Sequence, residues 1–288
     1  MFVRPPVGRP FPRRPQDNQP PEQEQTNSQQ EDEQFYPGVW DVLRVRRILE
    51  YKVLQDGMPT EVVDMIVDAA EYWPSTVAKL EEGRRIRKDL DEALVCTSPL
   101  CYDQKTLDTP SPKPLPHMTI HPCRKIVFTI VSHDQGGLSE RRVSESERPA
   151  YYDGSFTWFD AEVIHKAHEH TQREAVSAKL NPTERTPMHF GSNDFLLLPR
   201  SNALQRNRAR LQRAKRHTVV WHHLDDTPSD SPEAEETERY EGRGRDTLNG
   251  KQVREMEPGD SILVWARARF PGWVNYVDEL SVRVFWAL

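Results

Sequence analysis

Three consecutive residues, Ser132-His133-Asp134, are of the types that form a hydrolytic triad. A working triad needs its side chains hydrogen-bonded in series, which normally requires separated chain positions. On a continuing strand the side chains alternate, so His133 would point away from its two neighbours. The chain also has no G-x-S-x-G motif. We therefore interpret these residues as a strand end at which Asp134 and Gln135 organise the following Gly-Gly turn.

Histidine and cysteine residues offer a second chemistry, metal binding. The densest histidine cluster consists of His165, His168 and His170. These residues do not form H-E-x-x-H, and no cysteine pair at zinc spacing accompanies them. The chain has neither G-x-G-x-x-G nor a P-loop. The sequence therefore predicts no metal site and no nucleotide cofactor.

Charge is distributed in opposing runs. Residues 204–217 carry six basic side chains and no acid, whereas 225–246 carry nine acids and three arginines. We expect these runs to pair with each other or to lie in solvated loops, with nuclear import and nucleic-acid contact as the alternatives. A net charge of −6 and a pI near 6.0 argue against a globally basic nucleic-acid binder.

Composition limits the size of the core. Of 288 residues, 29% are charged and 36% hydrophobic, and the mean hydropathy is −0.79. Residues 1–36, rich in Pro, Gln, Glu and Arg, are predicted to be a disordered tail. There is no apolar run long enough for a membrane span and no secretory signal. Only three cysteines occur, which favours reduced thiols in the cytoplasm or nucleus.

Residues 37–95 are predicted to be a helical segment. Apolar residues recur at helical spacing from Val39 to Val53, and a second helix should follow Met58-Pro59. A third helix is expected over residues 76–94, with sparse apolar positions that place it on the surface.

Residues 96–288 are predicted to be an antiparallel β-sandwich with jelly-roll-like connections. In 261–269, apolar Ile262, Val264 and Ala266 alternate with a second face that carries Arg267 and Arg269, which is typical of a sheet with one buried side. Long polar loops are expected at 135–150, 165–192 and 225–250. The strand candidates are 124–132, 155–163, 193–198, 218–222, 261–269 and 280–286.

The loops at one end of this sandwich supply the candidate ligand contacts. Trp273 lies in a loop between two strands, where an indole could stack on a sugar ring or anchor a peptide. The alternative is that Trp273 closes the end of the core. Together the predicted ligand-binding residues are Asp134, Gln135, Arg269, Trp273 and Asn275.

Residues 56–67, DGMPTEVVDMIV, resemble the opening of an F-box, which begins with an apolar residue, a proline and an apolar helix. The likeness covers residues 56–73 at most, and residues 76–94 are more charged than that motif would be. The resemblance implies that the partner is a Skp-type adaptor. The residues that would face this adaptor are Met58, Pro59, Val62, Val63 and Ile66.

A second resemblance covers roughly residues 96–288. The stretches RKIVFTIVS, SFTWFDAEV, TVVWHH, DSILVWARARFPGWVN and SVRVFW are similar to a fungal family of uncharacterised proteins with a sandwich domain, itself similar to the galactose-binding-like jelly rolls of sugar-recognising ubiquitin-ligase receptors.

Three functional hypotheses follow. The first is a non-catalytic binding protein of F-box type that recognises a protein or glycan through the sandwich-end loops. The second is an interaction or scaffold protein with no ligase link. The third, least favoured, is a hydrolase that uses His133 or His165 with nearby acids.

Overall fold

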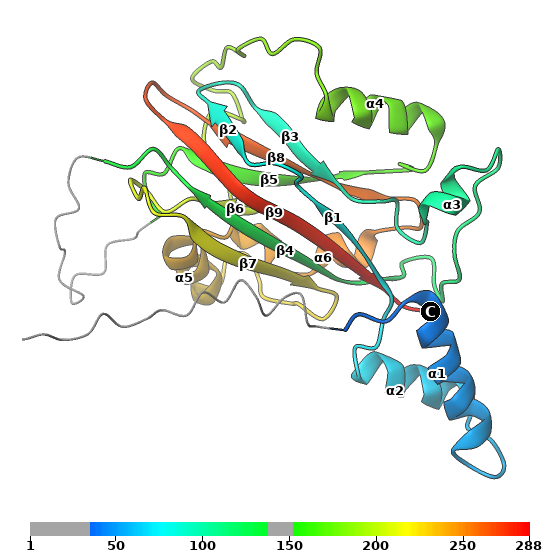
Figure 1. Cartoon of the computed structure of the whole chain (residues 1–288). Coiled ribbons are helices and arrows are strands. Elements are labelled where there is room, and N and C mark those ends of the chain that lie inside the picture. Colours follow the sequence, from blue (N-terminus) through cyan, green and yellow to red (C-terminus); the bar gives the residue numbers. More distant parts are fainter. Residues whose placement is uncertain (1–34, 138–151) are drawn as a thin grey trace, which may run out of the picture. The chain divides into compact units, whose positions relative to one another are not determined.

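The strands that follow residue 74 form two antiparallel β-sheets (Figure 1). The computed structural model describes residues 35–137 and 152–288. One sheet has the order β1-β9-β4-β7, with β2 also paired to β9; its strands are β1 (Ser75–Lys79), β2 (Arg84–Arg87), β4 (Cys123–His133), β7 (Lys215–His222) and β9 (Val274–Trp286). The other sheet has the order β3-β8-β5-β6; its strands are β3 (Glu92–Cys96), β5 (Thr157–Ile164), β6 (Gln205–Arg206) and β8 (Ser261–Ala268).

A common apolar core lies between the two sheets. Phe128 of β4 pairs with Val282 of β9 in one sheet, and both side chains belong to the same buried cluster as Ile262 and Val264 of β8 in the other sheet. The alternation predicted for residues 261–269 is therefore confirmed for its apolar face. Because both sheets contribute side chains to one core, the architecture is a β-sandwich.

The other face of β8 is also covered. Helix α4 (His170–Leu180) lies over this sheet, and its Val176 packs in a cluster with Leu263 of β8 and Ile164 of β5 (Figure 1). The expectation that only one side of this strand is buried is therefore wrong, because α4 covers the second side and Leu263 on it is fully buried.

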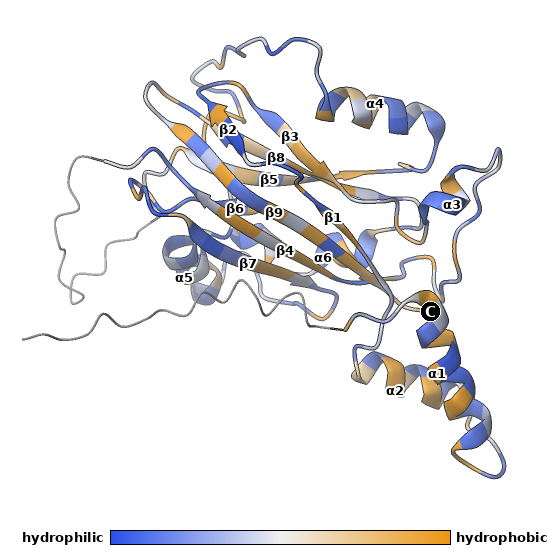
Figure 2. Ribbon diagram, in the orientation of Figure 1, coloured by the Kyte–Doolittle hydropathy of each residue, from blue (hydrophilic) through white to orange (hydrophobic). Residues whose placement is uncertain are grey.

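Two helices precede the sandwich strands, as predicted. Helix α1 (Val39–Lys52) and helix α2 (Thr60–Ala69) are joined by a short turn, in which the N–H of Met58 donates to the carbonyl of Glu50. Gly57 in this turn has φ of 79°, a conformation that favours glycine. We call the unit of α1 and α2 the helical hairpin. In Figure 2 the ribbon of this hairpin alternates between hydrophobic and hydrophilic residues.

The prediction of a third helix over residues 76–94 is wrong. This stretch forms β1, β2 and β3, separated by turns. Gly83 lies in the first turn, where a Cβ atom would be 3.2 Å from the carbonyl oxygen of Val277. The charged residues that suggested a solvated helix surface lie in the turns and also in the strands, since β2 alone carries three arginines. Each short strand contributes only a few apolar side chains, and their spacing also fits a helical period.

The polar stretches also differ from the predictions. Residues 193–198 form turns in place of a strand, because Asp194 accepts a hydrogen bond from the N–H of Leu196. The loop predicted at 165–192 contains α4. The loop predicted at 225–250 contains α5 (Pro232–Glu241) and the 3₁₀ turn η2 (Arg245–Thr247), and α6 (Lys251–Glu255) follows it; a further short helix is α3 (Gln104–Leu107).

Two predictions fall largely on residues that the structure does not describe. These are the tail at 1–36 and the loop at 135–150. Among the described helices, none combines the length and the hydropathy of a membrane span.

Candidate functional site

The predicted ligand-binding residues lie around one end of the sandwich, where β4 ends and β9 begins. Gln135 follows β4, and its Oε1 accepts a hydrogen bond from the N–H of Val274 at 3.0 Å. The structure therefore brings Gln135 next to Trp273, as expected for residues at one rim. Trp273 is half-buried, with its ring edge-on to Phe156 at 5.1 Å between centroids.

Asp134 is a buried residue whose hydrogen bonds connect two loops. Its side chain is buried, and its two carboxylate oxygens accept hydrogen bonds from the N–H groups of Gly136 and Arg210. Burial raises the pKa of Asp134 above its ordinary value, although the two backbone N–H groups act in the opposite direction. The carboxylate thus joins two loops and has no free oxygen directed to solvent.

Asn275 belongs to a buried chain of polar side chains between the sheets. The Nδ2 group of Asn207 donates to the Oδ1 of Asn275 at 2.9 Å and to the Oγ1 of Thr157 at 3.0 Å. Ser132 donates to the Oδ1 of Asn207 at 2.6 Å. The Nδ2 of Asn275 donates to the carbonyl oxygens of Trp158 and Arg267. Because all these groups are buried and paired, the network fixes the strands at this end of the sandwich.

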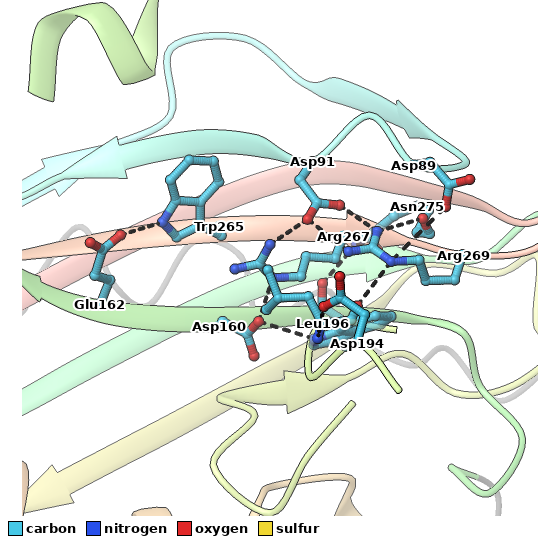
Figure 3. Close-up of polar contacts among 12 residues, drawn as sticks. Asp89, Asp91, Asp160, Glu162, Asp194, Leu196, Trp265, Arg267, Arg269 and Asn275 are labelled. Atoms are coloured by element: carbon cyan, nitrogen blue, oxygen red, sulfur yellow. Dashed lines mark hydrogen bonds and ion pairs between the residues drawn. The ribbon is translucent and has the colours of Figure 1, made fainter. Parts of the chain in front are cut away.

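Arg269 lies in a buried ion pair on the outer side of β8 (Figure 3). Its guanidinium donates to both oxygens of Asp91, at 2.5 and 2.8 Å, and both side chains are 0% exposed. Its Nε donates to the carbonyl of Leu196 at 3.0 Å, and its guanidinium lies 3.8 Å from the ring centroid of Phe190. Arg269 therefore anchors the chain around 190–196 across the sheet.

Arg267 extends the same cluster. It pairs with Asp91 and with Asp160, and its guanidinium lies 5.5 Å from the ring centroid of Trp265 (Figure 3). The Nε1 of Trp265 donates to Glu162 at 2.8 Å. The cluster is a structural clamp, because each buried charge has an opposite partner within hydrogen-bond distance.

The five predicted residues thus divide into two groups. Asp134, Arg269 and Asn275 are buried and use their polar atoms within the protein, so they position the rim and do not contact a ligand directly. Gln135 and Trp273 retain accessible surface. Sequence reasoning missed the partners Asp91 and Asn207. The placement of Arg267 and Arg269 on one strand face is a signal that acidic partners are needed nearby.

The residues considered for a hydrolytic triad are not connected in series. Ser132 donates to Asn207, and the Nδ1 of His133 lies 2.6 Å from the carbonyl oxygen of Asp134. The His133 ring stacks on Tyr276.

The predicted histidine cluster is dispersed among separate partners. His165 lies 3.2 Å from Asp260, His168 stacks on Tyr102, and His170 lies beside Glu174 on α4. Within residues 35–137 and 152–288, the acidic, histidine and cysteine side chains form no group of three or more that could hold a metal ion.

The basic and acidic runs meet, as the sequence predicted. Arg206 of the basic run pairs with Glu238 of α5 at 2.8 Å, and Arg245, which belongs to the acidic run itself, approaches the same carboxylate at 3.5 Å. Other members of the basic run make different contacts, since Arg216 pairs with Glu279 of β9.

The helical hairpin has a buried face and an exposed face. Val63 and Val67 of α2, one turn apart, pack with Trp73 and Phe285 at the end of β9. Arg46 of α1 reinforces this attachment by pairing with Asp64 of α2 and by donating to the carbonyl of Leu288 at 2.8 Å.

Part of the exposed surface of α2 is apolar. Val62 is 41%, Met65 72% and Ile66 39% exposed, whereas Val63 is fully buried. We call these three residues the α2 outer face. Large apolar side chains are also exposed on α1 and in the turn after it, namely Trp40, Ile48, Tyr51, Val53 and Leu54. Val62, Met65 and Ile66 are neighbours on one helix face, and a contiguous exposed apolar patch marks an interaction site more often than isolated apolar residues do.

The residues predicted to face an adaptor divide accordingly. Pro59, Val62 and Ile66 are exposed and Met58 is half-buried. Val63 is covered by the end of the sandwich, so its predicted contact with an adaptor is wrong. Helical geometry explains the split, since adjacent residues on a helix point about 100° apart. No family model, no curated protein and no solved structure matches this chain.

Proposed function

We propose that this chain is a non-catalytic binding protein that docks a partner protein on the helical hairpin and presents the sandwich as a recognition module. The partner that we propose is a Skp-type adaptor, in keeping with the resemblance of residues 56–73 to an F-box. The sandwich would then be a galactose-binding-like jelly roll, with a glycan or protein ligand at its rim.

The observation that carries this proposal is the division of α2 into two apolar faces. A helix that only supports the sandwich would have one apolar stripe and a polar exterior. Here Val63 and Val67 already attach the helix, and the α2 outer face is left over. Full burial of a side chain such as Met65 contributes about 1.5–3 kcal/mol, so the α2 outer face can supply several kcal/mol to a complex.

The rim of the sandwich supports the recognition role. Gln135 and Trp273 keep accessible surface, and Trp273 belongs to an aromatic cluster with Phe156 and Phe270. The buried groups of Asp134 and Asn275 hold the surrounding loops in place. A half-exposed indole on a rigid scaffold is a suitable platform for a sugar ring or an apolar side chain.

The test is co-purification of the full chain with a Skp-type adaptor. We expect the wild type to form the complex, and Met65→Asp and Ile66→Asp to weaken it at least tenfold. Leu224→Asp is the matched control, because Leu224 lies after β7 and is as exposed as Met65, at 72%. Loss of binding in the control as well would contradict a specific surface.

The second candidate, a scaffold protein without a ligase link, makes a different prediction for the same experiment. If the adaptor fails to bind the wild type, the ligase role is excluded. The exposed α2 outer face would then serve a different protein partner, which the same two variants would still release in a pull-down from cell extract.

A further inference from the structure

A partly open hollow of about 200 Å³ lies between α4 and the edge of the sheet formed by β3 and β8. Its walls are mostly apolar and include Pro99, Ala167, Val176 and Leu180. This hollow is separate from the helical hairpin and from the rim around Trp273, so it does not depend on the proposed function.

Two polar side chains that line the hollow have unsatisfied groups. Ser261 is 1% exposed, and among the described residues its Oγ has no partner other than the weakly interacting thiol of Cys96. The buried Nε of Arg173 also lacks a partner there. The guanidinium of Arg173 makes one long hydrogen bond, from Nη1 to the carbonyl of Leu107 at 3.3 Å. Buried donors without acceptors are rare, so an unsatisfied buried donor indicates that a further group binds beside it.

The residue beside Ser261 is a poor hydrogen-bond partner for its hydroxyl group. The Cys96 thiol lies beside Ser261, and a thiol is only a weak hydrogen-bond partner. Burial raises the pKa of Cys96 to about 11, so the thiol is neutral near pH 7 and does not repel an anion. Arg173 is the only charged residue among those that line the hollow, and its charge is positive.

We propose that this hollow binds a small apolar monocarboxylate, whose carboxylate accepts hydrogen bonds from Arg173 and Ser261 while its apolar part lies against Val176 and Leu180. The carboxylate satisfies both donors and neutralises the guanidinium. A cavity of about 150 Å³ is large enough for benzene. The observed volume of about 200 Å³ therefore suits an acid the size of benzoate or hexanoate.

The experiment is isothermal titration calorimetry, in which the full chain is titrated with benzoate and with benzamide. Benzamide has the same shape and no charge. We expect benzoate to bind at least about tenfold more tightly than benzamide, because hydrogen bonds to a charged group are the stronger ones. Equal affinity for the two compounds would overturn the proposal.

Variants locate the site. Arg173→Gln should weaken benzoate binding at least about tenfold, and Ser261→Ala should weaken it less. Lys179→Gln is the matched control, because Lys179 is on the same helix, pairs with Glu162 and does not line this hollow. If Lys179→Gln weakened binding as much as Arg173→Gln, the assignment would be wrong. Ala167→Leu, which fills the hollow without removing a charge, should abolish binding in a protein with an unchanged circular dichroism spectrum.

A series of linear acids distinguishes small acids from long-chain lipids. Affinity should rise from acetate through butyrate to hexanoate and then stop rising, because the volume is filled. A continued rise to decanoate would contradict a hollow of this size.

Discussion

The buried ion pair between Arg269 and Asp91 makes a sharp prediction about stability. In Asp91→Asn the carboxylate is lost, whereas Arg269 stays fully buried and charged and keeps the longer contact to Asp89, 4.0 Å from its Nε. Arg267 loses one of its two acidic partners and keeps Asp160. Removing one member of a buried pair typically costs about 3–5 kcal/mol, because it leaves an uncompensated charge. Both side chains of the pair are 0% exposed, so we expect a loss in this range.

The assay is urea unfolding of the full chain, followed by tryptophan fluorescence and by circular dichroism. The midpoint should fall at an unchanged m-value, as expected when stability alone changes. Glu279→Gln is the matched control, since Glu279 pairs with Arg216 at an exposed position. Exposed pairs contribute roughly 0–1 kcal/mol, so this variant should unfold almost as the wild type does.

A double variant tests the reason for the effect. In Asp91→Asn with Arg269→Met, the buried charge of Arg269 is gone. The double variant should therefore lose less free energy of unfolding than the two single variants lose in sum. An Asp91→Asn variant that loses no more free energy of unfolding than Glu279→Gln would refute the reasoning that this pair is desolvated.

Three other predictions follow from burial. Val63→Asp should destabilise the chain by about 3 kcal/mol or more in urea unfolding, whereas Val62→Asp, one residue away on the exposed face, should stay near the wild type. Burial lowers the pKa of His217 from 6.5 to about 4, so the unfolded chain binds this proton more readily. This residue should lower the stability by up to about 3 kcal/mol as the pH decreases from 6.5 to 4, and His217→Asn should reduce the slope of the profile. A smaller slope should remain, because burial also lowers the pKa of His223 to about 4. Burial raises the pKa of Cys96 to about 11 and that of Cys123 to about 12. A thiol reagent at pH 8 should therefore react slowly with these cysteines in the native protein and completely in urea. Fast labelling of the native protein would contradict this.

Local pattern was sufficient to predict the strands with strong alternation. The stretches that became β4, β5, β7, β8 and β9 carry β-branched and aromatic residues in runs that a helix would not favour. The region of 76–94 lacked that signal, because its strands are only four or five residues long and the turns between them are highly charged. Gly83 was the residue that argued against a helix there.

The sequence was enough to predict where the candidate site lies, but not which of its polar side chains are free to bind a ligand. The order of strands brings Gln135 next to Trp273, which follows from two loops at one sheet end. Whether a polar residue is free depends on partners that are distant in sequence: Asp91 lies 178 residues before Arg269, and Asn207 lies 68 before Asn275. No local pattern encodes such pairs, so Arg269 and Asn275 looked available although both are buried.

The two proposed binding sites can be distinguished by measuring both ligands with the variant of each site. Met65 belongs to α2, whose inner face packs at the end of β9, whereas Arg173 belongs to α4, which packs on the other sheet. Changes at well-separated sites without shared partners usually act independently. Met65→Asp should therefore weaken adaptor binding and leave the affinity for benzoate within about twofold, and Arg173→Gln should do the reverse. If each variant impaired both activities, a general loss of folded structure would explain the results, and neither surface could be assigned its own ligand.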